Sequence, residues 1–103
     1  MTAREAMTLA EDLLVPAKAW VRKTLPNFDD EVRQTVAACF LDLQNAGVVN
    51  FSAADPLLQQ AAKLYTKAHF GYDSESEKWE QAYEHLKAAL SLSSDYTEVP
   101  ADG

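Results

Sequence analysis

The stretch that decides the fold is DPLLQQAAKLYTKAHFGYD, residues 55–73, because it carries the signals for both ends of a helix. Asp55 is a favourable N-cap, since its carboxylate can accept a free backbone N–H of the first turn, and Pro56 suits the first helical position. Gly71 stands where a left-handed residue commonly ends a helix. The apolar residues between these signals recur at helical spacing, and they are Leu57, Leu58, Ala61, Leu64, Tyr65 and Ala68. The stretch therefore predicts an amphipathic helix with one buried face.

Three helical patterns precede this stretch. Residues 2–14 have a helical composition and predict a first helix or a frayed arm, and residues 16–25 predict a second helix that Pro26 ends. The next helix begins with three consecutive acids at 29–31, where the helix dipole favours negative charge, and Gly47 ends it. We interpret these acids as residues of a helix start, because a calcium loop needs ligands that alternate around a central glycine.

One further helix follows the stretch, and a polar segment ends the chain. The helix begins at Ser74, whose spacing from Glu77 matches a capping box. Residues 93–103 are mostly polar and predict a mobile tail that becomes ordered only against a neighbouring chain. The chain is therefore predicted to contain an arm or helix at 1–15, a helical domain at 16–92 and a tail at 93–103.

The fold class predicted from these patterns is all-α, a small bundle of four to five short helices around a single core. A length of 103 residues with 48% hydrophobic residues is typical of one globular domain, although a core of this size gives only a modest margin of stability. The residues that the patterns place in this core are Val36, Phe40, Leu64, Tyr65, Trp79, Tyr83 and Leu86.

The charge of the chain argues against a nucleic-acid-binding protein. The net charge is −7, and residues 72–103 alone carry eight acids and two bases. Tight binding to nucleic acid normally needs a basic patch, which this sequence lacks. The longest apolar run, residues 36–41, is far too short to span a bilayer, so we expect no membrane contact and a location in the cytoplasm.

No pattern in the sequence indicates catalysis or metal binding. His69 and His85 lie on neighbouring predicted helices, but a metal site needs three or four ligands, and no HExxH or CxxC spacing is present. Cys39 lies within an apolar stripe and cannot form an internal disulfide, because it is the only cysteine. We therefore predict no catalytic residues, no cofactor, no metal and no enzymatic activity.

Several segments, taken in order, resemble a known family. They are AKAWVR at 17–22, FDDEV at 28–32, DLQNAGV at 42–48, DPL at 55–57, LYTKAHFGYD at 64–73 and YEHLKAAL at 83–90. Their order and spacing resemble the small head–tail connector proteins of tailed bacteriophages, also called head-completion proteins or DNA-packaging adaptors. The resemblance runs from about residue 16 to residue 96.

This resemblance implies a structural subunit of the virion neck, assembled in the host cytoplasm. In such a role, copies of the chain form a homo-oligomeric ring beneath the portal protein. DNA passes through this ring without specific binding, and the ring provides the docking surface for a tail or stopper protein. The family has no catalytic residues to carry over. Among the many aromatic residues, we predict that Trp20, Phe28, Phe51 and Tyr96 contact another chain.

Two other classes of protein remain as alternatives. A helix-turn-helix DNA-binding regulator should present several basic residues on its recognition helix, whereas residues 55–70 contain only Lys63 and Lys67. A small helical enzyme would need a cluster of polar side chains that the sequence does not reveal. A gel shift at low salt tests the regulator, and a bound metal or ligand in the purified protein would favour the enzyme.

Overall fold

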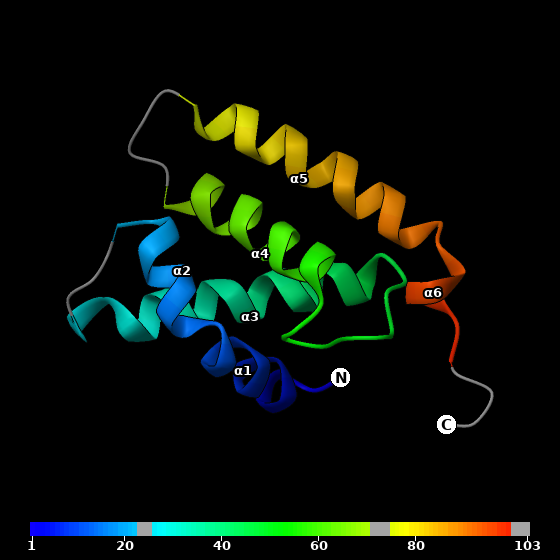
Figure 1. The fold of residues 1–103 in the computed structure, drawn as a ribbon, viewed down its shortest axis with the longest axis horizontal. Helices are drawn as coiled ribbons and strands as arrows, with labels where there is room; N and C mark the ends of the chain where they lie inside the picture. Colours follow the sequence, from blue (N-terminus) through cyan, green and yellow to red (C-terminus); the bar gives the residue numbers. More distant parts are fainter. Residues whose placement is uncertain (23–25, 71–74, 100–103) are drawn as a thin grey trace.

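The computed structural model describes residues 1–22, 26–70 and 75–99, and within these ranges it contains helices and no strand. The elements are α1 (Ala3–Asp12), α2 (Leu14–Trp20), the 3-10 turn η1 (Pro26–Phe28), α3 (Asp29–Asn45), α4 (Pro56–His69), α5 (Ser76–Ser91) and α6 (Ser94–Thr97). In Figure 1, α4 lies between α3 and α5, while α1 and α2 pack on α3. The all-α, single-core prediction is confirmed, and the short elements η1 and α6 were not predicted.

The core runs along α3 and α4, and the predicted core residues are only partly correct. Val36, Phe40, Leu64 and Tyr83 are buried as predicted. The prediction was wrong for three residues, which are half-buried at the margin of the core: Tyr65, Trp79 and Leu86. Two of these belong to α5, which packs mainly against α4 at the edge of the bundle and therefore buries only a narrow stripe.

The helix that the deciding stretch predicts is present as α4, and its N-cap is confirmed. The carboxylate of Asp55 accepts hydrogen bonds from the backbone N–H groups of Leu57 at 2.9 Å and Leu58 at 3.2 Å. Pro56 occupies the first helical position. Leu57 was wrongly placed on the buried face, because it is 46% exposed in the first turn. Gly71, the predicted stop, lies outside the described residues, as does Ser74 of the predicted capping box.

The N-terminal residues form a folded helix and not a frayed arm. Thr2 and Glu5 bond each other's backbone N–H groups in a capping box, and α1 buries Ala6 and Ala10 against the core. Arg33 of α3 donates to Glu11, so an ion pair also joins α1 to α3. The composition of residues 2–14 predicted a helix or a frayed arm, but this capping box was not identified from the sequence.

The second helix begins earlier and ends earlier than predicted. It starts at Leu14, and Pro16 is its third residue, where the missing N–H removes no intrahelical hydrogen bond. It ends at Trp20, before the predicted boundary at residue 25, which lies outside the described residues. The predicted start was wrong because proline tolerates any position in the first turn, and the first position is only the commonest.

Gly47 ends α3 as predicted, and the geometry explains why a glycine is needed there. Its φ of +112° lies in the left-handed region. Its N–H donates to the carbonyl of Gln44 at 3.0 Å, and the N–H of Val48 donates to that of Leu43 at 3.1 Å. This pair of hydrogen bonds is the Schellman motif, which satisfies carbonyls that the helix end would leave free.

Arg22 has the same kind of backbone without the freedom of a glycine. Its φ is +57°, just beyond the end of α2, and its side chain is exposed. The left-handed conformation costs an L-residue about 1–2 kcal/mol, a cost that glycine avoids. Part of this gain is lost, because glycine has a larger conformational entropy in the unfolded state. Replacement of Arg22 by Gly should therefore raise the free energy of unfolding by about 0.5–1 kcal/mol. Chemical denaturation followed by circular dichroism measures this, and a less stable variant would contradict it.

Candidate interaction surface

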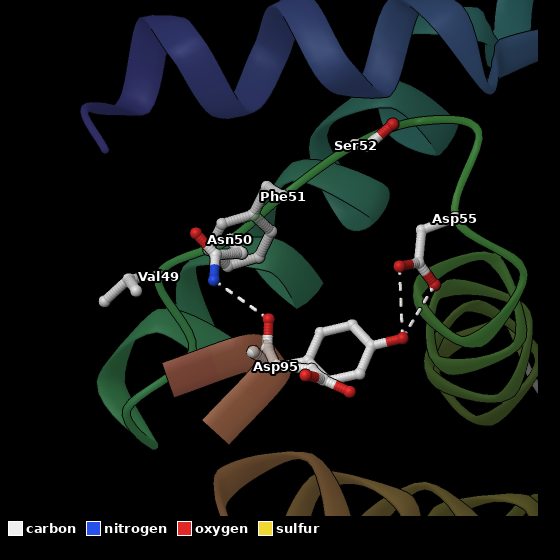
Figure 2. A pocket seen from close by; sticks show the side chains of 7 residues that line it. Val49, Asn50, Phe51, Ser52, Asp55 and Asp95 are labelled. Carbon is white, nitrogen blue, oxygen red and sulfur yellow. Dashed lines mark hydrogen bonds between the residues drawn. The ribbon is translucent and has the colours of Figure 1, made fainter. Parts of the chain in front are cut away.

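The loop between α3 and α4 is fastened to α6 by hydrogen bonds to the α6 backbone. The N–H groups of Val49 and Asn50 donate to the carbonyl of Tyr96 at 2.8 Å and 3.2 Å. The side-chain amide of Asn50 donates to the carbonyls of Asp95 at 2.9 Å and Glu98 at 2.8 Å, and Figure 2 shows the first of these bonds. A helix of only four residues is thus held in one position by the neighbouring loop.

An open groove lies between this loop and α6, with a volume of about 530 Å³. Its lining residues, seen in Figure 2, are Val49, Asn50, Phe51, Ser52, Asp55, Asp95 and Tyr96. We call it the α6 groove. It brings together Phe51 and Tyr96, two of the four residues that the sequence singled out for contacts with another chain. The ring of Phe51 also packs edge-to-face on Phe40, with the centroids 5.8 Å apart.

Tyr96 connects α6 to the beginning of α4. Its hydroxyl lies 3.1 Å from both carboxylate oxygens of Asp55 and donates to that carboxylate, as the dashed lines in Figure 2 show. Partial burial, together with the hydrogen bond to Asp55 and the charge of this carboxylate, raises the pKa of Tyr96 above its usual value of 10.0. Asp55 therefore caps α4 and anchors α6 with a single side chain.

These contacts correct the prediction that the chain has no fixed structure of its own from residue 93 onward. Residues 94–97 are helical, and Tyr96 and the backbone around it bond to the α3–α4 loop. Composition alone suggested a tail because the segment is polar, but its hydrogen bonds join residues more than 40 positions apart in the sequence. The last residues, 100–103, lie outside the described part of the chain.

The other two predicted contact residues lie away from the α6 groove. Trp20 is the last residue of α2 and Phe28 the last of η1. All four of the predicted residues are half-buried and pack against the core. Their packing contributes to the fold, and their contact with another chain stays a prediction.

Exposed apolar side chains surround α6. Leu92 precedes it and is 87% exposed, Val99 follows it and is 74% exposed, and Val49 at the α6 groove is 47% exposed. Val15 on α2 is 81% exposed. Single exposed apolar residues are ordinary, but three at one end of a small molecule mark a candidate surface for another protein.

A polar cluster that the sequence analysis missed joins α3 to α5. The hydroxyl of Tyr83 donates to the carboxylate of Asp42 at 2.7 Å, and the ammonium of Lys87 donates to the same oxygen at 3.0 Å. Lys87 also forms an ion pair with Glu84 at 3.0 Å. Burial acts to raise the pKa of Asp42, but the hydrogen bonds from Tyr83 and Lys87 outweigh it, so the pKa is lowered. Both bonds are structural, because they hold α5 against the core.

Two of the three candidate reactive side chains, Cys39 and His69, occupy structural positions. Cys39 is buried, as predicted, and burial raises the pKa of its thiol to about 12. The imidazole of His69 stacks on Tyr65 with ring centroids 4.0 Å apart, whereas His85 lies on the exposed face of α5. Across the described ranges, no group of three or more His, Cys, Asp or Glu side chains is placed to hold a metal ion. In the same ranges, every helix is too short or too polar to cross a membrane.

The outward face of α5 is acidic. Glu77, Glu80 and Glu84 lie along one side of the helix, together with Gln81 and His85, and they line a shallow depression. Because these carboxylates are exposed, this face repels other anions rather than binding them.

Replacement of Tyr96 by Phe should lower the free energy of unfolding by about 0.5–1.5 kcal/mol, the usual net value of one hydrogen bond. The aromatic ring is kept, so the loss isolates the bond to Asp55. Thermal and urea denaturation measure it. Replacement of Thr97 by Val, which removes a local hydrogen bond from Thr97 to the carbonyl of Ser93 just before α6, is the matched control and should cost less. Equal stability of wild type and Tyr96→Phe would show that the hydroxyl does not fasten α6.

Comparison with known proteins identifies the family. The family model described as phage connector protein matches residues 14–97. No curated protein and no solved structure matches the chain. The matched range starts at the first residue of α2 and ends at the last residue of α6, so it covers every element described here except α1. The match also agrees with the resemblance found in the sequence between about residues 16 and 96. The chain therefore belongs to the phage connector protein family.

Proposed function

We propose that this connector protein is the subunit of a homo-oligomeric ring that binds the portal protein of the phage head. The ring extends the DNA channel and offers a docking surface to the tail or to a stopper protein, which places it in the virion neck after assembly in the host cytoplasm. The observation that carries this proposal is the family match across α2 to α6.

The surface of the subunit supports an assembly role. Exposed apolar side chains lie at α6 and also on α2, which is far from α6 along the longest dimension of the molecule in Figure 1. A subunit with exposed apolar side chains in two separate places can bind one neighbour at each, as a ring requires. The family is a structural one, and two of the reactive side chains described above, Cys39 and His69, are used in packing.

Passing DNA is accommodated by repulsion rather than by binding. The acidic surplus is exposed on α5, where Glu77, Glu80 and Glu84 form one side of the helix. A channel wall with this charge lets DNA slide without a sequence-specific hold. The same charge disfavours the helix-turn-helix alternative, whose recognition helix needs several exposed bases.

A gel shift with duplex DNA should show no sequence-specific complex at physiological salt. The physical reason is the net charge of −7. The chain has few basic side chains that could contact phosphates and release the counterions bound to DNA. Submicromolar, sequence-dependent binding would contradict the expectation and favour a regulator.

The experiment that tests the proposed function combines the chain with the portal protein of the same phage. Electron microscopy of the mixture should show a ring of density added to the end of the portal that faces away from the head. Co-sedimentation should give one chain for each portal subunit. The matched control replaces this portal by the portal of an unrelated phage, and the chain should not bind to it. If the chain and its own portal sediment separately at all concentrations, the proposed function is wrong.

A further inference from the structure

One face of α2 is exposed and has no neighbour in the fold. Val15 and Ala19 are four residues apart and lie on one side of the helix, Arg22 follows just beyond the helix end, and all three are exposed. We call this set the α2 stripe. The first two are apolar, and the guanidinium of Arg22 has no side-chain partner among the described residues.

A second surface has the opposite charge. Leu92 and Val99 flank α6 and are 87% and 74% exposed, and between them Glu98 exposes a carboxylate. We call this set the α6 edge. In the described part of the chain the carboxylate of Glu98 has no ion-pair partner, while its backbone carbonyl is held by Asn50 at 2.8 Å.

We propose that the α2 stripe of one copy docks on the α6 edge of the next copy, with Arg22 pairing with Glu98 and Val15 covering Leu92 and Val99. This rests on the proposed function, because it assigns the contact by which the ring assembles. The partner is a second copy because the chain itself supplies both complementary halves, apolar against apolar and cation against anion. Within one copy they cannot meet, since α2 and α6 lie toward opposite ends of a molecule 42 Å long (Figure 1).

Both surfaces are held rigidly before they meet. Ala17 of α2 is fully buried, and α2 packs against α3 and α4. The α6 edge is fixed by the bonds from Asn50 and by Tyr96 on Asp55. Little conformational freedom is lost when such surfaces dock, which favours binding through a small area. Because different surfaces meet, each copy uses its α2 stripe on one neighbour and its α6 edge on the other, so the contact repeats from copy to copy and forms a ring where the rotation between copies closes.

Disulfide cross-linking tests the contact directly in the full chain. The variants are Val15→Cys and Val99→Cys, and the native Cys39 does not interfere because it is fully buried. Each variant alone should stay uncross-linked under mild oxidation, whereas a mixture of the two should give a dimer. The double variant should give a ladder of higher species. Dimers of either variant with itself, or no cross-link in the mixture, would overturn the proposal.

The ion pair between Arg22 and Glu98 is tested first by removing the charge of Arg22 and then by reversing it. Replacement of Arg22 by Gly should weaken self-association at least tenfold in sedimentation at low salt, and this loss cannot come from unfolding, because the same change is expected to stabilise the fold. Arg4→Ala is the control, since Arg4 is an exposed arginine on α1 outside the stripe, and it should leave association unchanged. Arg22→Glu should abolish association, and adding Glu98→Arg should restore it. Failure of this restoration would overturn the pairing.

The outcome for the contact is separable from that for the proposed function. If the chain forms rings on the portal but the mixed cysteine variants do not cross-link, the contact is wrong and the connector ring stands. If the chain neither joins the portal nor cross-links at any concentration, both are wrong.

Discussion

Replacement of Phe40 by alanine should lower the free energy of unfolding by about 3–5 kcal/mol, the largest effect expected of a single substitution in this chain. Phe40 is 1% exposed and belongs to α3, the helix against which α1, α2 and α4 all pack. Its ring also supports Phe51 of the α3–α4 loop. The substitution therefore leaves a cavity in the core beneath the α3–α4 loop, and the surrounding side chains can fill it only in part.

Guanidinium denaturation followed by circular dichroism measures this loss. For a small domain whose total stability is about 5–15 kcal/mol, the variant should be close to unfolding at 37 °C. Leu92→Ala is the matched control, because Leu92 is 87% exposed, and its effect should stay within about 0.5 kcal/mol. A loss below 1 kcal/mol for Phe40→Ala would show that the core does not centre on α3.

Replacement of Asp42 by alanine should lower the free energy of unfolding by about 1–3 kcal/mol, because the buried hydroxyl of Tyr83 loses its acceptor. Lys87 keeps Glu84 as a partner, so the loss falls mainly on the tyrosine. Urea denaturation measures the effect. Glu84→Ala is the control: it removes an ion pair at the surface and should cost less than about 0.5 kcal/mol. If the two variants were equally stable, the bond between Tyr83 and Asp42 would contribute nothing to the fold.

The difference in stability between wild type and Asp42→Ala should also depend on pH, in a direction that the pKa of Asp42 fixes. The pKa of Asp42 is lowered in the fold from its ordinary 3.8, so the folded state favours the carboxylate. The stabilisation is fully present above the ordinary pKa and is lost as the pH falls through the lowered one. The difference in stability between wild type and Asp42→Ala should therefore be constant near neutral pH and shrink in acid below that value.

Local signals in the sequence were sufficient to predict most of the helices. Asp55 and Pro56 mark the beginning of α4, and Gly47 marks the end of α3, because caps depend on residues within one turn of the helix end. Periodicity likewise placed Val36 and Phe40 in the core. These features follow from the local chain and need no knowledge of its neighbours.

The rest depends on which helices become neighbours, which local patterns do not encode. Tyr83 and Asp42 are 41 positions apart, as are Tyr96 and Asp55, and neither pair is marked by any spacing rule. The exposure of Trp79 has the same origin, since its face of α5 is covered by two lysine side chains instead of a further helix. The candidate surface around α6 could not be predicted for this reason, although two of its aromatic residues were.

The contact between Tyr96 and Asp55 has a consequence for how the molecule opens. It joins the beginning of α4 to the segment after α5, so it closes the α4–α5 hairpin at its open end. An edge helix such as α5 would otherwise peel away one turn at a time from its free terminus. With that terminus tied to the cap of α4, the two helices lose their protection against amide hydrogen exchange together, as a single cooperative unit.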